Sequence, residues 1–212
     1  MNSRRITAAL TASILMAFLY APASASEKVP VHLEYGCEWG CTATLYHYYH
    51  IDYTARGTGS RVDVQEPRGV FRPVGDILFY IGAEIGDKCS VDLNCGYGAL
   101  FDDRRVVPVT VRATFFPKGR KHLATKVFIE GGSAFAKTYD GGLPAIAKLG
   151  TGKRVELARR ISMDVDIALQ MAMDRPDSAF DYVHNVQVTP SQLLFSRAVY
   201  AGINLSLSLN FR

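Results

Sequence analysis

The sequence beyond residue 25 lacks any long hydrophobic run, and this excludes a chain held in a membrane by helices. A membrane-spanning helix needs about 20 mostly apolar residues, and no later run approaches that length. Only helices and closed barrels satisfy every backbone polar group in lipid. If this part of the chain crosses a membrane, it must therefore cross as β-strands.

A large charge of one sign is also missing. The chain has 24 basic and 20 acidic residues, a net charge of +4, and the basic residues are scattered along it. No basic run is interleaved with stacking aromatics, so the sequence predicts no nucleic-acid partner. With 48% hydrophobic residues over a length of 212, it predicts one folded domain.

The common catalytic and cofactor motifs are absent as well. The sequence has no G-x-S-x-G elbow and no C-x-x-C-H haem site. Gly57-Thr58-Gly59 and Gly150-Thr151-Gly152 lack the Lys-Ser/Thr ending of a phosphate loop. His47 and His50 are three apart, which on a strand puts them on opposite faces and prevents a shared metal ion. We therefore predict no cofactor, no metal site, no catalytic residue and no enzyme activity.

The N-terminus has the features of a signal peptide. Arg4 and Arg5 are followed by apolar residues 6–20 and by the A-x-A site Ala23-Ser24-Ala25. We predict cleavage before Ser26, with the twin-arginine export route as an alternative. Residues 26–41, which include the only tryptophan, are predicted to form a leader segment, either a short extra strand or a lid.

The last stretch, residues 197–212, alternates strictly between apolar and small or polar side chains. Val199, Ala201, Ile203 and the apolar residues up to Phe211 alternate with small or polar ones. A period of two indicates a strand whose successive side chains point to opposite faces. Oily residues toward lipid and small polar residues toward a lumen are typical of an outer-membrane barrel. The last strand of a soluble sandwich is the alternative.

Seven more segments show strand signals, giving eight in all. The predicted strands are residues 42–54, 61–71, 76–87, 105–116, 122–136, 143–152, 157–173 and the stretch from 193 onward. The connections at 72–75, 117–121 and 153–156 are short and follow even strands, whereas the long ones, 88–104 and 174–192, follow odd strands. Short turns at one end and long loops at the other are typical of transmembrane barrels. The sequence thus predicts an all-β fold, an eight-stranded antiparallel up-and-down transmembrane β-barrel over residues 42–212.

Charged residues of both signs fall on the inward positions of these strands. An eight-stranded barrel is only wide enough for side chains to fill its lumen. Because an isolated buried charge is very costly, these residues must pair. We predict a structural salt-bridge network made of Glu84, Arg112, Lys126, Glu130, Asp164 and Asp166.

The chain resembles the small eight-stranded outer-membrane β-barrels, the OmpA-like or outer membrane protein beta-barrel domain group. The likeness covers residues 42–212 and is carried by the signal peptide, the strand at 107–112, the Gly-Gly turn near 141 and residues 203–211. It implies a monomer in the bacterial outer membrane, surrounded by lipid. It also implies that the barrel-assembly machinery reads Phe211 as an assembly signal, although Arg212 follows it here.

The four cysteines are an even number in a chain predicted to be exported, which favours disulfides. A zinc site is the alternative, but C-x3-C and C-x5-C are not the usual ligand spacings. In the predicted topology one pair lies at each end of the barrel, roughly 25 Å apart. Since a disulfide needs Cα atoms within about 7 Å, we predict the local pairs Cys37–Cys41 and Cys89–Cys95.

The sequence therefore predicts an integral outer-membrane protein with a filled lumen and a structural or surface-loop interaction role. One alternative is an exported soluble β-barrel whose apolar inner face binds a small apolar ligand. Another is a lipid A-modifying enzyme that recruits His184 and Ser191 from the 174–192 loop.

Overall fold

The structure is a computed structural model that describes residues 30–212 except 101–103, 121–122, 136–142, 177–178 and 182. Within these residues the chain forms ten strands: β1 (Val31–Thr54), β2 (Arg61–Ile85), β3 (Cys89–Leu100), β4 (Arg104–Phe115), β5 (Leu123–Phe135), β6 (Ala145–Ala158), β7 (Ile161–Asp174), β8 (Ala179–Asp181), β9 (Val186–Val188) and β10 (Leu193–Phe211). No described helix is long and apolar enough to cross a membrane. The predicted signal peptide, residues 1–25, lies outside the described residues.

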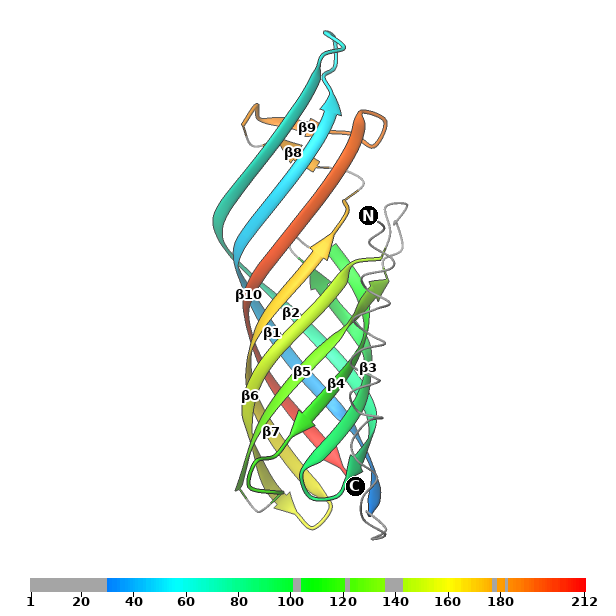
Figure 1. Cartoon of the computed structure of the whole chain (residues 1–212), viewed down its shortest axis with the longest axis vertical. Helices are drawn as coiled ribbons and strands as arrows, with labels where there is room; N and C mark the ends of the chain where they lie inside the picture. Colours follow the sequence, from blue (N-terminus) through cyan, green and yellow to red (C-terminus); the bar gives the residue numbers. More distant parts are fainter. Residues whose placement is uncertain (1–29, 101–103, 121–122, 136–142, 177–178, 182) are drawn as a thin grey trace, which may run out of the picture.

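Eight of the strands form a closed antiparallel barrel (Figure 1), as predicted. Their order around the ring is β1-β10-β7-β6-β5-β4-β3-β2, so consecutive long strands are neighbours. The first and last long strands close the ring, with a register that runs from Tyr35↔Phe211 to Tyr53↔Leu193. Strands β8 and β9 form a separate two-stranded hairpin between β7 and β10.

The two ends of the barrel differ in their connections. We call the end that holds residues 86–88, 116–120 and 159–160, together with the C-terminus, the turn end. The opposite end, which we call the loop end, holds residues 55–60, the last residues of β3 and β5, the first residues of β4 and β6, and the described part of the segment 175–192. The predicted loop at 174–192 is thus placed correctly.

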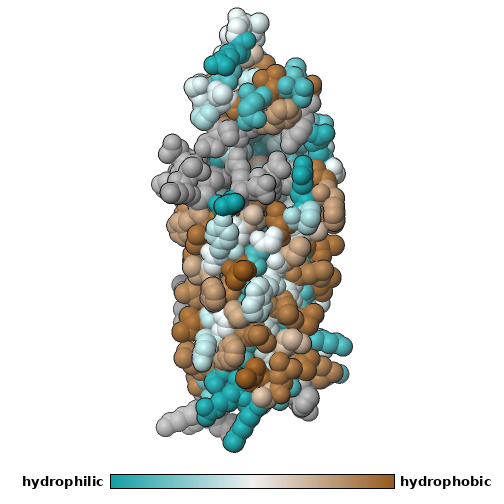
Figure 2. Space-filling model, turned by 180° about the vertical axis from the view of Figure 1, so that it is seen from behind, coloured by the Kyte–Doolittle hydropathy of each residue, from teal (hydrophilic) through white to brown (hydrophobic). Residues whose placement is uncertain are grey.

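Side chains alternate between a polar lumen and an apolar outer face. Leu205 and Val165 are 56% and 53% exposed on the outside, whereas Asn204 and Asp164 are 2% and 1% exposed inside. Figure 2 shows hydrophobic side chains over the barrel wall and hydrophilic ones gathered at its lower end. We call the exposed apolar residues on the outer face of the eight barrel strands the belt. A soluble barrel has the opposite arrangement, with an apolar core and a polar outer face.

The predicted number of strands is right, but two of the predicted segments are wrong. Predicted strands 61–71 and 76–87 form the single strand β2, so the predicted turn at 72–75 lies within a strand. Residues 61–75 of β2 pair with β1 and with no other described strand, because β3 pairs only from Asp76 onward. An edge position tolerates Pro67 and Pro73, since a proline there needs no N–H partner.

One segment predicted as a loop is a strand, and the described part of the leader takes the first of its two predicted forms, a strand. Most of the predicted loop at 88–104 is β3, and residues 31–41 of the predicted leader are the first half of β1. In both, small or acidic residues such as Gly36, Glu38 and Asn94 point inward and give the sequence a loop-like composition. The predicted turn at 153–156 also belongs to a strand, because β6 continues to Ala158.

Inward glycines leave room for large side chains in the narrow lumen. A Cβ atom on Gly36 would lie 2.4 Å from the hydroxyl oxygen of Tyr80. A Cβ atom on Gly152 would lie 1.9 Å from Oδ1 of Asp166. Both contacts are far below van der Waals distance, so these positions require glycine if Tyr80 and Asp166 are to point inward.

The upper parts of β1, β2 and β10 continue beyond the barrel at the loop end as a three-stranded ribbon (Figure 1). The β8–β9 hairpin packs on this ribbon through a hydrophobic cluster of Tyr49, Ile51, Tyr53, Val64 and Val188. We call the ribbon and the hairpin together the cap. Its own buried apolar cluster gives the cap a fixed shape outside the barrel wall.

Candidate functional site

The centre of the lumen is held by Arg112 on β4. Its guanidinium contacts Glu38 of β1 at 2.5 and 2.9 Å, and Glu130 of β5 at 2.6 and 2.8 Å. Ser208 donates to Glu38 at 3.1 Å, and Thr110 donates to Glu130 at 2.7 Å. All three charged side chains are nearly inaccessible to solvent. The arrangement compensates each buried charge by short bonds from opposite sides of the lumen.

A second group surrounds Asp164 on β7. Its carboxylate accepts a hydrogen bond from Lys126 Nζ at 2.5 Å and two from Arg154, from Nε at 2.8 Å and Nη2 at 2.9 Å. Lys126 also lies 2.9 Å from Asp166. The lumen charges predicted from the sequence therefore meet in the structure, and each takes part in an ion pair.

Glu84 occupies the turn end of the lumen. Arg120, Arg154 and Arg212 approach its carboxylate at 3.2, 3.4 and 2.8 Å. Below it, the ring of Phe116 is fully buried, and the guanidinium carbons of Arg120 and Arg154 lie 4.9 and 5.1 Å from its centroid. This aromatic ring, held by cations, closes the turn end of the lumen.

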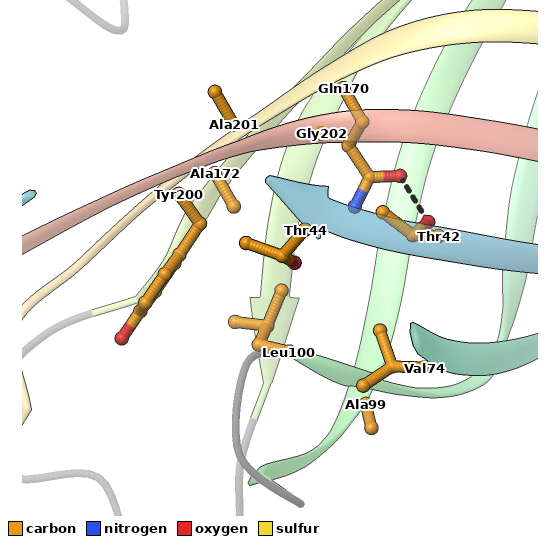
Figure 3. Close-up of a pocket in the computed structure, with 10 residues that line it drawn as sticks. All are labelled: Thr42, Thr44, Val74, Ala99, Leu100, Gln170, Ala172, Tyr200, Ala201 and Gly202. Carbon is orange, nitrogen blue, oxygen red and sulfur yellow. Dashed lines mark hydrogen bonds between the residues drawn. The ribbon is translucent and has the colours of Figure 1, made fainter. Parts of the chain in front are cut away.

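The loop end of the lumen is filled differently. A buried apolar cluster there contains Leu100, Val106, Ala134, Ile146, Ala172, Ala198 and Tyr200. Just beneath it lies a cavity of about 10 Å³, lined by Leu100, Tyr200 and Thr42 among others (Figure 3). Thr42 donates a hydrogen bond to Gln170 at its edge, 3.0 Å long. A space of this size holds about one water molecule.

Part of the lumen network was not predicted from the sequence. Four further carboxylates and two cations point inward, all of them on β1, β2, β3 or β6: Glu34, Glu38, Asp76, Asp92, Lys148 and Arg154. Most of them lie in segments predicted as leader, turn or loop. The missed signal was alternation, since Leu33, Tyr35 and Trp39, which neighbour the β1 carboxylates in the sequence, are exposed and largely apolar.

The cap contains a small buried polar centre at Asp181. Tyr53 donates to its carboxylate at 2.8 Å, His184 Nδ1 lies 2.7 Å from it, and the backbone N–H groups of Val183 and His184 donate to it at 2.8 and 3.1 Å. Asp181 thus ties the hairpin to β1. Ser191 contacts Thr189 at 3.2 Å, and no described contact joins it to His184.

Docking of the cap is predicted to be strongest between about pH 4 and pH 10 and to weaken outside this range. Burial opposes ionisation of Asp181, but hydrogen bonds from His184 and Tyr53 lower its pKa overall. This stabilisation is present above the usual carboxyl pKa and disappears as the pH falls below it. Burial and the bond to Asp181 raise the pKa of Tyr53 to about 12. That stabilisation is complete below about pH 10 and disappears as the pH rises toward 12.

Limited proteolysis of residues 175–192 across pH measures this docking. Tyr53→Phe is expected to remove the alkaline transition and keep the acid one, and Asp181→Asn is expected to do the reverse. If both variants keep both transitions, Tyr53 and Asp181 do not hold the hairpin.

The cysteine prediction is wrong. Cys37 and Cys41 lie on β1, Cys89 and Cys95 lie on β3, and all four are free. Four residues along a strand span about 13 Å and six span about 20 Å, beyond the reach of a disulfide. Their side chains lie on the outer face, between apolar residues such as Trp39 and Leu93. The described residues contain no group of three or more His, Cys, Asp and Glu side chains suited to a metal ion.

We expect an alkylating reagent to add to all four cysteines when the protein is denatured without reductant. Intact mass measured before and after alkylation checks this, with a reduced sample as control. A mass increase corresponding to two or fewer additions, recovered to four by reduction, would contradict the geometry.

Comparisons with solved structures give likenesses at low identity. Neisserial surface protein A is 9% identical, with a TM-score of 0.42, over 86% of this chain and 98% of that one. The outer membrane protease OmpT from Escherichia coli is 8% identical, with a TM-score of 0.39, over 88% and 99%. The Salmonella secretin InvG is 8% identical, with a TM-score of 0.24, over 94% and 64%. No family model and no curated protein matches the sequence.

One of these structures corrects the prediction that the chain is not an enzyme. OmpT is an outer membrane protease. At 8% identity the likeness assigns no activity to the present chain, and its enzyme status is not established.

Proposed function

We propose that the chain is an integral protein of the bacterial outer membrane, a β-barrel with a side-chain-filled lumen that presents its cap for a structural or surface-interaction role. The observation that carries this proposal is the inversion of polarity across the barrel wall. Leu149, Leu169 and Phe79 are more than 60% exposed, whereas Arg112, Glu130 and Asp164 are almost completely buried. A barrel that faces lipid has this arrangement.

The area of exposed apolar surface supports a lipid environment. The belt extends over all eight barrel strands, and six of its members lie on β7 alone: Ile161, Val165, Ile167, Leu169, Met171 and Met173. A soluble monomer rarely exposes a contiguous apolar patch larger than a few hundred Å². In hydrocarbon the same surface has no such cost, because water does not contact it.

The soluble ligand-binding alternative has little support in this geometry. It requires an apolar inner face, but the inside of the barrel carries paired charges from the turn end to its centre. A second cavity there, also about 10 Å³, is lined by charged side chains including Arg112, Lys126 and Asp164. Neither cavity has room for a small apolar ligand.

Because the lumen is filled, we assign the interaction role to the cap. Ion pairs, the Phe116 ring and the apolar cluster occupy successive levels of the lumen. The cap, by contrast, projects beyond the barrel with its own packed core and exposed side chains such as Val183 and Leu194. With the short turns in the periplasm, the cap faces the cell exterior.

We also propose that the barrel-assembly machinery reads the end of β10, including Phe211, as its assembly signal. The mature protein is a monomer surrounded by lipid. The Phe211 ring also stacks on Tyr35 of β1, with ring centroids 5.7 Å apart. An aromatic residue at 211 therefore has a second use, because this stack joins the two strands that close the barrel.

Labelling of whole cells tests location and orientation together. In a background without the native cysteines, Gln187→Cys in the cap is expected to react with a membrane-impermeant maleimide, since Gln187 is exposed. The matched control, Lys118→Cys in the 116–120 turn, is expected to react only after the outer membrane is opened. Folded protein should also migrate differently on a gel with and without heating. Reaction of Lys118→Cys in intact cells would reverse the orientation, and recovery of the protein in a detergent-free soluble fraction would overturn the proposal.

A further inference from the structure

Basic side chains gather at the turn end of the barrel. Each of its three turns carries at least one exposed cation, and another lies on the outer face of β6: Lys88, Lys118, Arg159, Arg160 and Lys153. We call these five residues the basic collar. Asp87 is the only described acidic side chain exposed within the three turns, because the nearby Glu84 points into the lumen.

The basic collar is not used by the fold. Within the described residues none of its five members takes part in an ion pair, whereas Arg120 and Arg212 at the same end are bound to Glu84. Five surface cations held at one end repel one another unless an external anion compensates them. An anionic partner at the collar would therefore be electrostatically favourable.

The collar borders the belt. Ile85 and Phe115 precede two of the turns, and Leu157 and Ile161 flank the third; all four are exposed and apolar. Lys153 lies higher, level with Val165 on β7, with a long stem that can extend toward the end of the barrel. Cations directly next to lipid-facing side chains match the position of phospholipid headgroups.

We propose that the basic collar binds the anionic headgroups of phospholipids in the inner leaflet of the membrane. This inference rests on the proposed function, which places the turn end in the periplasm. The ligand chemistry is a phosphate diester of negative net charge next to acyl chains. The lipids around this end are then enriched in phosphatidylglycerol-like molecules relative to zwitterionic ones.

Lipid retention in vesicles of defined composition tests the inference. The full chain is inserted into vesicles of phosphatidylcholine mixed with phosphatidylglycerol, extracted in mild detergent, and its bound lipids are counted by native mass spectrometry. Each basic residue near an anionic surface accounts for about a fivefold preference, so the collar as a whole is expected to favour phosphatidylglycerol at least tenfold at low salt. Added salt should weaken this preference.

The variant K88Q/K118Q/K153Q/R159Q/R160Q is expected to lose the preference, and R159Q/R160Q, which disturbs one turn only, to lose part of it. The matched control, R56Q/R105Q/R197Q, removes exposed cations from the loop end and the cap and is expected to keep it. Heat-dependent gel migration verifies that each variant is folded.

Equal lipid ratios in the natural chain and the collar variants would overturn the inference while leaving the proposed function standing. The same loss in the loop-end control would also overturn it. Binding to peptidoglycan without lipid preference would replace it by a polymer partner. Failure of the chain to insert into the vesicles would contradict the proposed function as well.

Discussion

Arg112→Met is expected to lower the free energy of unfolding by about 3–5 kcal/mol, because it leaves two buried carboxylates without their main cation. Glu38 and Glu130 both bind this guanidinium, and the side chain of each is only 1% exposed. Lys148, at 3.7 Å from Glu130, cannot replace the bidentate contacts. Urea titration of protein reconstituted in vesicles measures the loss.

The triple variant E38Q/R112M/E130Q separates charge imbalance from packing. Removing all three charges leaves no uncompensated ion, so this variant is expected to recover most of the stability lost in Arg112→Met. Arg105→Met, at an exposed position on the same strand, serves as the control and is expected to have almost no effect. If Arg112→Met is as harmless as Arg105→Met, the network does not stabilise the lumen.

Leu169→Arg is expected to destabilise the barrel by about 2–4 kcal/mol if its outer face contacts lipid. Leu169 lies in the outward row of β7, farther from the turn end than Val165 and Lys153, and is 66% exposed. The cost comes from placing a guanidinium in hydrocarbon, where neither water nor a counter-ion solvates it. Urea titration in vesicles measures it.

Leu194→Arg is the matched control. Leu194 lies in the cap, is 60% exposed and is also a leucine, so the two substitutions differ mainly in the surroundings of the side chain. Its expected effect is within about 0.5 kcal/mol. Equal and small effects at both positions would indicate water on both, and would contradict the membrane proposal.

The alternation of apolar and polar residues along the sequence correctly predicted most of the barrel strands. In β7 and in residues 199–211 of β10 the large aliphatic residues point outward, and apart from Tyr200 the inward residues are small or polar, so the period of two is easily visible. In β1 and β3 the same period exists, but the inward residues are Gly, Glu, Asn and Asp, the residues that also mark turns. Local composition therefore favoured loops where sheet pairing enforces strands.

The lumen partners could not be predicted from the sequence. Arg112 lies on β4, and its partner Glu38 lies on β1, three strands away around the ring and 74 residues away in the chain. Such pairs depend on the stagger between strands, which no single strand reveals. The cap was missed for a related reason, because residues 61–75 are a strand without a second neighbour and contain two prolines.

The distribution of charge over the strands also constrains the order of events in biogenesis. Two acids of the lumen, Glu34 and Glu38, are on β1, while the cations that bind them, Arg154 and Arg112, are on β6 and β4. A partly built sheet would expose these ions to acyl chains before their counter-charges arrive. If the barrel enters lipid as proposed, we expect ring closure to accompany entry into hydrocarbon, because a half-open sheet would leave these ions without their partners.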